Sequence, residues 1–97
     1  MNFQEIADNI KAQAAKTSPL GGTFKLELDD NIVFIDGTGS ENIVSFEDKE
    51  ADTVIATSIQ AMTDMINGEL NPMMATMTGK VKIKGNMGLA MKLQSFL

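Results

Sequence analysis

The side chains that could do chemistry in this sequence are carboxylates, lysines and hydroxyls. The 97 residues include no His, Cys, Trp or Tyr, and every basic residue is a lysine. Without His and Cys, neither a Ser-His-Asp nor a Cys-His arrangement can be built, and zinc, haem and iron–sulfur sites lose their usual ligands. The side chain best suited to general-base catalysis near neutral pH is also missing. We therefore expect a protein that is not an enzyme and that uses no metal or organic cofactor.

Short glycine-containing stretches give only weak signals for phosphate binding. Gly37-Thr38-Gly39 lacks the third glycine of the dinucleotide fingerprint, and Gly79-Lys80 precedes a valine where a P-loop has Ser or Thr. Residues 85–88 resemble the GXXG clamp of KH domains, but the surrounding order of elements differs. Residues 36–41 offer oxygen atoms for calcium without the EF-hand spacing. Solvated turns are the simpler interpretation of all these stretches.

The methionines form the sharpest pattern, because seven of the eight lie between positions 62 and 91. Methionine is unbranched and polarizable, so it adapts to ligands of varying shape but specifies a single packing arrangement poorly. The excess fits a deformable apolar pocket, a core that uses methionine as filler, or a surface that binds another protein. The pocket explains it best. The candidate lining residues are Phe34, Met62, Met65, Ile66, Met73, Met74, Met77, Met87, Met91 and Leu93.

Charge is distributed unevenly along the chain. The net charge is −5, yet residues 79–97 carry four lysines and no acidic residue. The overall acidity argues against nucleic acid as a partner, since nucleic-acid binding requires clustered basic side chains. Lys80, Lys82 and Lys84 share one face of a predicted strand. These lysines protect a solvated sheet edge or attract anionic lipid headgroups and membrane surfaces.

The first half of the chain predicts a helix and four strands. Apolar residues at helical spacing predict the helix over about residues 3–16, starting at a capping box formed by Asn2 and Glu5. Alternating or continuous apolar runs then predict strands at 23–28, 32–35, 43–46 and 53–56. Short turns join the first three strands, which indicates an antiparallel meander.

The second half is mainly helical. Thr57 and Gln60 predict a capping box for a helix that Gly68 ends, and Asn71-Pro72 starts a short helix. A strand over 80–84 and a helix from Met87 to about Leu97 follow. Of the two apolar stripes on this last helix, one can cover the sheet and the other needs a ligand, a partner or a membrane.

The order α-β-β-β-β-α-α-β-α indicates an α+β fold. We expect residues 1–97 to form a single domain, with a five-stranded, mainly antiparallel sheet covered on one face by helices. No stretch has the length of a transmembrane helix, and the N-terminus lacks the basic and apolar regions of a secretory signal. Without cysteine, no disulfide ties the chain to an oxidising compartment. A cytoplasmic protein is the expectation.

Two segments carry a resemblance to a known family. Residues 67–73 (NGELNPM) and above all residues 79–93 (GKVKIKGNMGLAMKL) resemble the sterol carrier protein-2 family, and residues 51–55 resemble one of its strands. The resemblance implies a five-stranded sheet, helices over it and an apolar tunnel between them, with no catalytic residues. It further implies binding of fatty acids, fatty acyl-CoA, phospholipids or sterols. Two departures, an end at Leu97 without the peroxisomal signal and a short loop between the second and third strands, argue against a peroxisomal location and against sterol itself as the ligand. They favour a compact, bacterial-type version of the lipid-binding domain.

We therefore expect a carrier that holds a fatty acid, acyl-CoA, phospholipid or sterol-like lipid without catalysis. Lipid would be its main partner, with transient membrane contact, and the protein would be a monomer or a weak homodimer. Burying about twelve methylenes at ~0.8 kcal/mol each contributes roughly 10 kcal/mol, and association costs of ~4–15 kcal/mol reduce this to micromolar binding. The alternative is an interaction or accessory module whose Met/Leu C-terminal helix docks on a partner or on a second copy.

Overall fold

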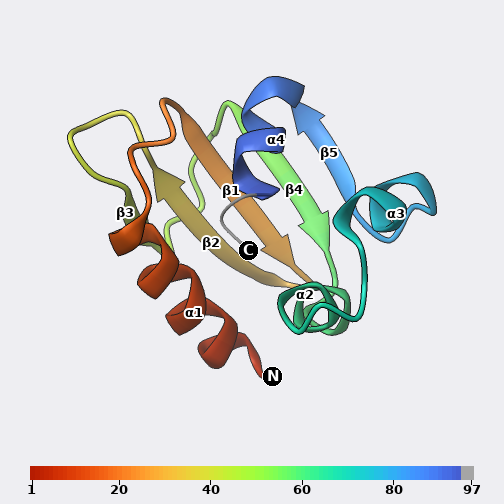
Figure 1. The fold of residues 1–97 in the computed structure, drawn as a ribbon. Coiled ribbons are helices and arrows are strands. Elements are labelled where there is room, and N and C mark those ends of the chain that lie inside the picture. Colours follow the sequence, from red (N-terminus) through yellow and green to blue (C-terminus); the bar gives the residue numbers. More distant parts are fainter. Residues whose placement is uncertain (95–97) are drawn as a thin grey trace.

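The computed structural model describes the backbone of residues 1–94 and the side chains of residues 1–92. Within this part of the chain, four helices and five strands follow each other in the predicted α-β-β-β-β-α-α-β-α order (Figure 1). The elements are α1 (Phe3–Lys16), β1 (Thr23–Leu28), β2 (Asn31–Asp36), β3 (Ile43–Ser45), β4 (Thr53–Thr57), α2 (Ile59–Ile66), α3 (Pro72–Met77), β5 (Lys82–Gly85) and α4 (Met87–Gln94). The last helix was expected to reach Leu97, but residues 95–97 lie outside the described part.

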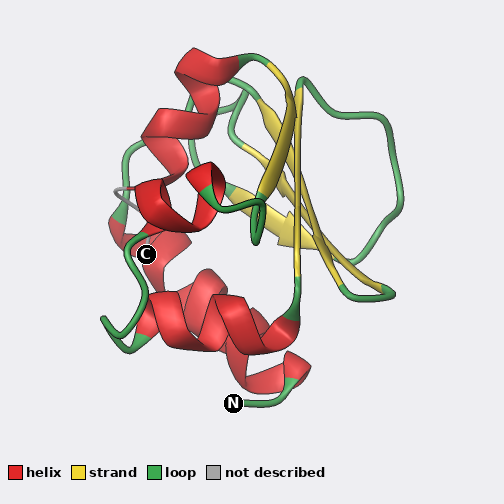
Figure 2. Ribbon diagram, turned by 90° about the vertical axis from the view of Figure 1, so that its right-hand side faces the viewer, coloured by secondary structure: helices red, strands yellow, loops and turns green. Residues whose placement is uncertain are grey.

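The strands form one mixed sheet in the order β3-β2-β1-β4-β5. β1 pairs with β2, β2 with β3, and β4 with β5 in antiparallel fashion, whereas β1 and β4 run parallel. The predicted meander and the mainly antiparallel sheet are therefore confirmed. Helices lie on one side of this sheet, and a long connecting loop passes on the other (Figure 2). We call these sides the inner face and the outer face.

The parallel pairing requires the chain to cross from β3, at one edge, to the far side of β1. Residues 46–52 make this crossing over the outer face. There the Lys25 ammonium pairs with the Asp48 carboxylate at 2.9 Å, and the Lys49 ammonium lies 5.6 Å from the centre of the Phe34 ring. The crossing loop thus covers β1 and β2 on the outer face, while β5 remains an open edge.

α1 covers the inner face at the β3 side of the sheet. Its amphipathic sequence places Ile6, Ile10 and two alanines on one side, where each is buried. Opposite them lie buried side chains of β1 and β2, including Phe24 and Leu26. Fully burying each large apolar side chain contributes about 1.5–3 kcal/mol. This half of the domain is therefore a conventional core made of branched and aromatic residues.

Side-chain caps set the starts of α1 and α3 as the sequence predicted. The Glu5 N–H donates to the Asn2 side-chain oxygen at 2.8 Å, and the Asn2 N–H donates to the Glu5 carboxylate at 3.0 Å. At α3 the Asn71 side-chain oxygen accepts from the Met73 N–H at 2.8 Å, with Pro72 in the first turn. These caps satisfy N–H groups that have no partner inside the helix.

The predicted start of α2 was wrong by one residue. Thr57 is the last residue of β4, and its hydroxyl donates to the Lys80 carbonyl at 2.8 Å. Ser58 is the cap instead, since its hydroxyl oxygen accepts from the Ala61 N–H at 3.0 Å. Both residues carry a hydroxyl, so composition did not distinguish them. The bond from Thr57 joins the end of β4 to the segment that leads into β5.

A tight junction between Asp52 and the turn at Gly85 positions α4. Gly85 has a φ of +98°, and a Cβ atom added there would lie 2.2 Å from the Asp52 carbonyl oxygen. The same oxygen accepts from the Asn86 N–H at 3.1 Å. The buried Thr53 hydroxyl donates to the Asn86 carbonyl at 3.0 Å. The chain can pass this point only with glycine, because both the space and the backbone angle exclude a side chain.

Gly85→Ala is expected to destabilise the protein by about 2 kcal/mol or more, because it combines a backbone clash with a left-handed conformation. Gly39→Ala is the matched control, since a Cβ atom at position 39 meets nothing within 4 Å. It should change the free energy of unfolding by less than about 0.5 kcal/mol. Urea unfolding followed by circular dichroism measures both. Equal stability of the two variants would contradict the junction described here.

Candidate functional site

An apolar cavity lies between the β4–β5 half of the sheet and the helices α2, α3 and α4. Its volume is ≈ 250 Å³. The lining residues are Ile55, Met62, Met65, Pro72, Met73, Thr76, Met77, Val81, Ile83, Met87, Ala90 and Met91. None of them is charged, and Thr76 carries the only polar side chain in this lining. We call this cavity the methionine pocket.

The floor of the methionine pocket is built from buried side chains. Ile55 and Ile83 are directly paired across β4 and β5 on the inner face. Met62, on α2, is only 2% exposed, and Met65 and Ala90 are also buried. The helical spacing of α2 puts Met62 and Met65 on the side that faces the sheet. The floor is thus part of the hydrophobic core.

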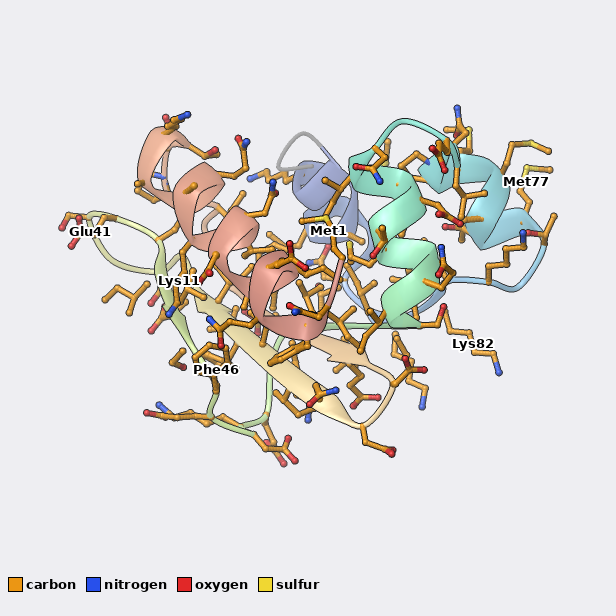
Figure 3. All side chains as sticks on the ribbon, turned by 90° about the horizontal axis from the view of Figure 1, so that it is seen from below. Met1, Lys11, Glu41, Phe46, Met77 and Lys82 are labelled. Atoms are coloured by element: carbon orange, nitrogen blue, oxygen red, sulfur yellow. The ribbon has the colours of Figure 1, made fainter. Side chains whose placement is uncertain are left out.

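The mouth of the methionine pocket is made of exposed methionines on α3 and α4. Met73 and Met77 come from α3, and Met87 and Met91 come from α4; each is more than half exposed. Met77 is 76% exposed, and its side chain projects outward from α3 (Figure 3). Apolar rims of this kind on soluble proteins mark sites that bind a ligand or a partner. The pocket is therefore a half-open groove with a deep apolar floor.

The structure brings together most of the methionines that the sequence singled out, but not every expected residue. Met74 belongs to α3 and is exposed, yet it does not line the pocket. Ile66 is half-buried and packs against the core instead. Leu93 lies in α4, but its side chain is outside the described part of the structure.

Phe34 was expected in the lining, and the structure places it on the opposite side of the sheet. It is paired with Lys25 on β1 and with Ser45 on β3, and the crossing loop buries it on the outer face. The expectation was wrong because β2 is apolar at four consecutive positions, 32–35. Such a strand carries no alternation from which its inward side could be identified.

Several lining residues were missed by the sequence reasoning, although two of them left a signal. Val81 and Ile83 alternate with lysines, so one face of that strand had to be apolar and turned inward. Ile55, Pro72, Thr76 and Ala90 carried no comparable signal, because nothing in their local pattern separates a pocket wall from an ordinary core.

Lys80, Lys82 and Lys84 lie outside the pocket. Lys82 and Lys84 are exposed on β5, paired with Ala56 and Val54, so they occupy the outer face while Ile83 points inward. Lys80 precedes β5 and is exposed as well. These lysines cannot reach a ligand on the pocket floor, and any contact they make with an anion takes place at the protein surface.

Ionisable groups with shifted pKa values also lie away from the pocket. The Thr38 hydroxyl, followed by the Thr38 N–H, donates to the Asp36 carboxylate and lowers the pKa of that carboxyl group. The hydrogen bond to Asp48 raises the pKa of Lys25. Among the described residues, no cluster of carboxylates could hold a metal ion. The described helices also include none with the length and apolar character needed to cross a membrane.

The fold and the methionine pocket together define an α+β domain that can hold an apolar ligand between sheet and helices. Comparison with known proteins is more specific. Residues 3–97 match the SCP-2 sterol transfer family, and the chain belongs to this family. The resemblance seen in the sequence is thereby confirmed.

Individual relatives agree with this assignment. Sterol carrier protein 2 of Rattus norvegicus is 33% identical over 101 residues, which cover 96% of this chain and 18% of the rat protein. The chain therefore spans less than a fifth of that relative. The sterol carrier protein domain 2 of Helicoverpa armigera superposes with a TM-score of 0.77 at 27% identity, covering 96% of this chain and 82% of the other. A palmitated sterol carrier protein 2-like protein of Aedes aegypti, with a TM-score of 0.74 at 21% identity over 98% and 93% of the two chains, shares the fold.

The division of the methionines into floor and mouth predicts opposite effects on stability. Met62→Ala should lower the free energy of unfolding by about 2–4 kcal/mol, because it opens a cavity in the core. Met77→Ala should change it by less than about 0.5 kcal/mol, because the side chain is exposed. Urea unfolding of ligand-free protein measures both. Similar losses in the two variants would show that Met77 is a core residue and that the pocket is closed.

Proposed function

We propose that this protein binds the apolar part of a lipid, above all a single acyl chain, in the methionine pocket and carries the lipid without chemical change. The observation that carries the proposal is the pocket itself, which has a buried apolar floor, an exposed apolar mouth and a single polar side chain, that of Thr76. Membership of the SCP-2 sterol transfer family supports lipid binding in general. Candidate ligands are fatty acids, fatty acyl-CoA, phospholipids and sterol-like lipids.

The composition of the pocket favours broad specificity for chain-bearing lipids. The described lining includes one hydroxyl, that of Thr76, and no set of buried polar groups that would reject a ligand lacking a matching headgroup. The cavity of ≈ 250 Å³ is slightly smaller than the ~300–1,000 Å³ of most ligand sites. Met73, Met77, Met87 and Met91 can move apart at low cost, since methionine side chains are flexible. A single acyl chain therefore suits the pocket best, and the palmitated relative supports this choice.

The same lining residues support the proposal that the protein carries a lipid without catalysing a reaction. Among the lining residues that the structure describes, no side chain titrates, and the Thr76 hydroxyl has no base beside it in the lining to activate it. The headgroup of a bound lipid would lie at the mouth, where water and surface side chains surround it. The proposed role is therefore to shield an acyl chain from water.

The test is a titration of delipidated protein with a fluorescent fatty acid such as NBD-stearate. We expect saturable, micromolar binding to the wild type, and extraction of freshly purified protein should recover lipid. Met77→Asp combined with Met91→Asp should weaken binding at least tenfold, because it places charges at the mouth of an apolar pocket.

Ile43→Asp is the matched control for this pair. Ile43 is also an exposed apolar residue, but it lies on β3 at the other edge of the sheet. Its substitution should leave the dissociation constant within about twofold of the wild type. The proposal fails if the wild type shows no saturation at tens of micromolar and no lipid is extracted. It also fails if Ile43→Asp weakens binding as much as the pocket variant does.

Bound lipid should also raise the thermal stability of the protein. Palmitate at one hundred times its dissociation constant is expected to add about 2.7 kcal/mol to the free energy of unfolding. Differential scanning fluorimetry of delipidated protein, with and without palmitate, measures the shift in melting temperature. The shift should shrink in the Met77→Asp/Met91→Asp variant, and an unchanged melting temperature of the wild type would contradict the proposed site.

A further inference from the structure

We propose that α3 and the lysines that follow it form a docking surface for an anionic phospholipid bilayer. This inference rests on the proposed lipid-carrying function, because it names the membrane as the partner from which the pocket takes its ligand. The surface consists of Met73, Met74, Met77, Lys80 and Lys82, and we call it the α3–β5 surface. It stands beside the β5 edge of the sheet, across the molecule from β3 (Figure 1).

The first observation is an apolar excess that a ligand in the pocket does not explain. α3 has only six residues, and three of them are methionines that are 59%, 53% and 76% exposed. Met73 and Met77 line the pocket mouth, but Met74 does not. An acyl chain in the pocket would leave Met74 in water. Met74 therefore extends the exposed apolar surface of α3 beyond the pocket mouth.

The second observation is the position of the lysines relative to α3. The Lys80 N–H donates to the Ala75 carbonyl at 2.8 Å, so the backbone of Lys80 is fixed against the end of α3. Lys82 follows at the start of β5. Met77 and Lys82 both project from this end of the molecule (Figure 3). The methionines of α3 and the lysines that follow it thus lie at the same end of the molecule.

The local charge at this end of the molecule is positive. Lys80, Lys82 and Lys84 lie on β5 or directly before it, and residues 70–97 include no acidic residue, although the whole chain has a net charge of −5. On the outer face, Lys82 is paired with Ala56, and Glu27 lies beyond it on β1. No ion pair joins Lys80, Lys82 or Lys84 to an acidic group among the side chains that the structure describes. An anionic surface would be attracted here and repelled by the acidic remainder.

This combination fits the interface of an anionic bilayer. Exposed methionines can enter the boundary between headgroups and acyl chains, while lysines beside them meet the headgroup phosphates. A second copy of the chain fits less well. A twofold dimer through this surface would place the same patch against itself and bring its lysines together. Met73 and Met77 belong to both the pocket mouth and the α3–β5 surface. The pocket mouth would therefore face the bilayer when the protein is docked.

The experiment is flotation of delipidated protein with vesicles of phosphatidylcholine alone or with 30% phosphatidylglycerol. The wild type should bind the anionic vesicles at least tenfold more tightly than the neutral ones, and added salt should weaken this binding because it screens exposed charges. Met74→Asp and the pair Lys80→Gln/Lys82→Gln should each weaken binding to anionic vesicles by about tenfold or more.

Matched controls come from the other side of the molecule. Ile43→Asp makes the same kind of change at an exposed apolar residue of β3, and Lys11→Gln/Lys16→Gln removes the same charge from α1. Both should bind vesicles within twofold of the wild type. The proposal is overturned if Met74→Asp or the Lys80/Lys82 pair binds like the wild type, or if the controls lose binding equally.

Two further measurements distinguish this proposal from the lipid-carrier proposal and from self-association. Met74→Asp should bind NBD-stearate in vesicle-free solution like the wild type, because Met74 lies outside the pocket. Vesicle binding by a wild type that takes up no fatty acid would refute the lipid carrier and keep the docking surface. Light scattering after size exclusion tests self-association: if Met74→Asp turns a vesicle-free dimer into a monomer, the surface is a dimer interface and the membrane proposal is wrong.

Discussion

The structure depends on how unequally its helices cover the inner face of the sheet. α1 has fourteen residues, lies at the β3 side of the sheet and adds isoleucines and alanines to the core that the buried side chains of β1 and β2 form. The β4–β5 half is covered by α2, α3 and α4, which have eight, six and eight residues. Short helices that carry methionine cannot close that half completely, because methionine fills space without fixing a single packing arrangement. The unfilled space is the methionine pocket, so the domain combines a closed core with an open apolar groove.

Connections between the strands keep these two halves in place. The parallel pairing of β1 and β4 sends residues 46–52 over the outer face, where Asp48 pairs with Lys25 and the loop buries Phe34. Beyond β4, the backbone of Gly85 passes directly against Asp52. This contact fixes where α4 begins and therefore where its methionines stand. The outer face is thus covered over β1 and β2, and the methionine pocket lies on the inner face.

Much of this fold could be predicted from the sequence, because its signals are local. The spacing of apolar residues predicted the order of the helices and strands, and the helix caps at Asn2 and Asn71 were recognisable from residue type and spacing. An apolar pocket lined by methionine was predictable, because the methionines are concentrated in consecutive helices. Its exact lining residues were not. Phe34 was misplaced because β2 has no alternating pattern, and Met74 because neighbouring positions on a short helix can face a pocket or water. The parallel pairing of β1 with β4 left no local signal, since it depends on contacts distant in the chain.

The central claim is that an acyl chain lies in the methionine pocket, and the methionines themselves can report on it. The protein would be labelled with 13C at the methionine methyl groups, and its spectrum recorded during a palmitate titration. Signals of Met62, Met65, Met73, Met77, Met87 and Met91 should shift together, whereas Met1 and Met74 should change little. Shifts confined to Met1 or Met74, or an unchanged spectrum at saturating palmitate, would contradict the account.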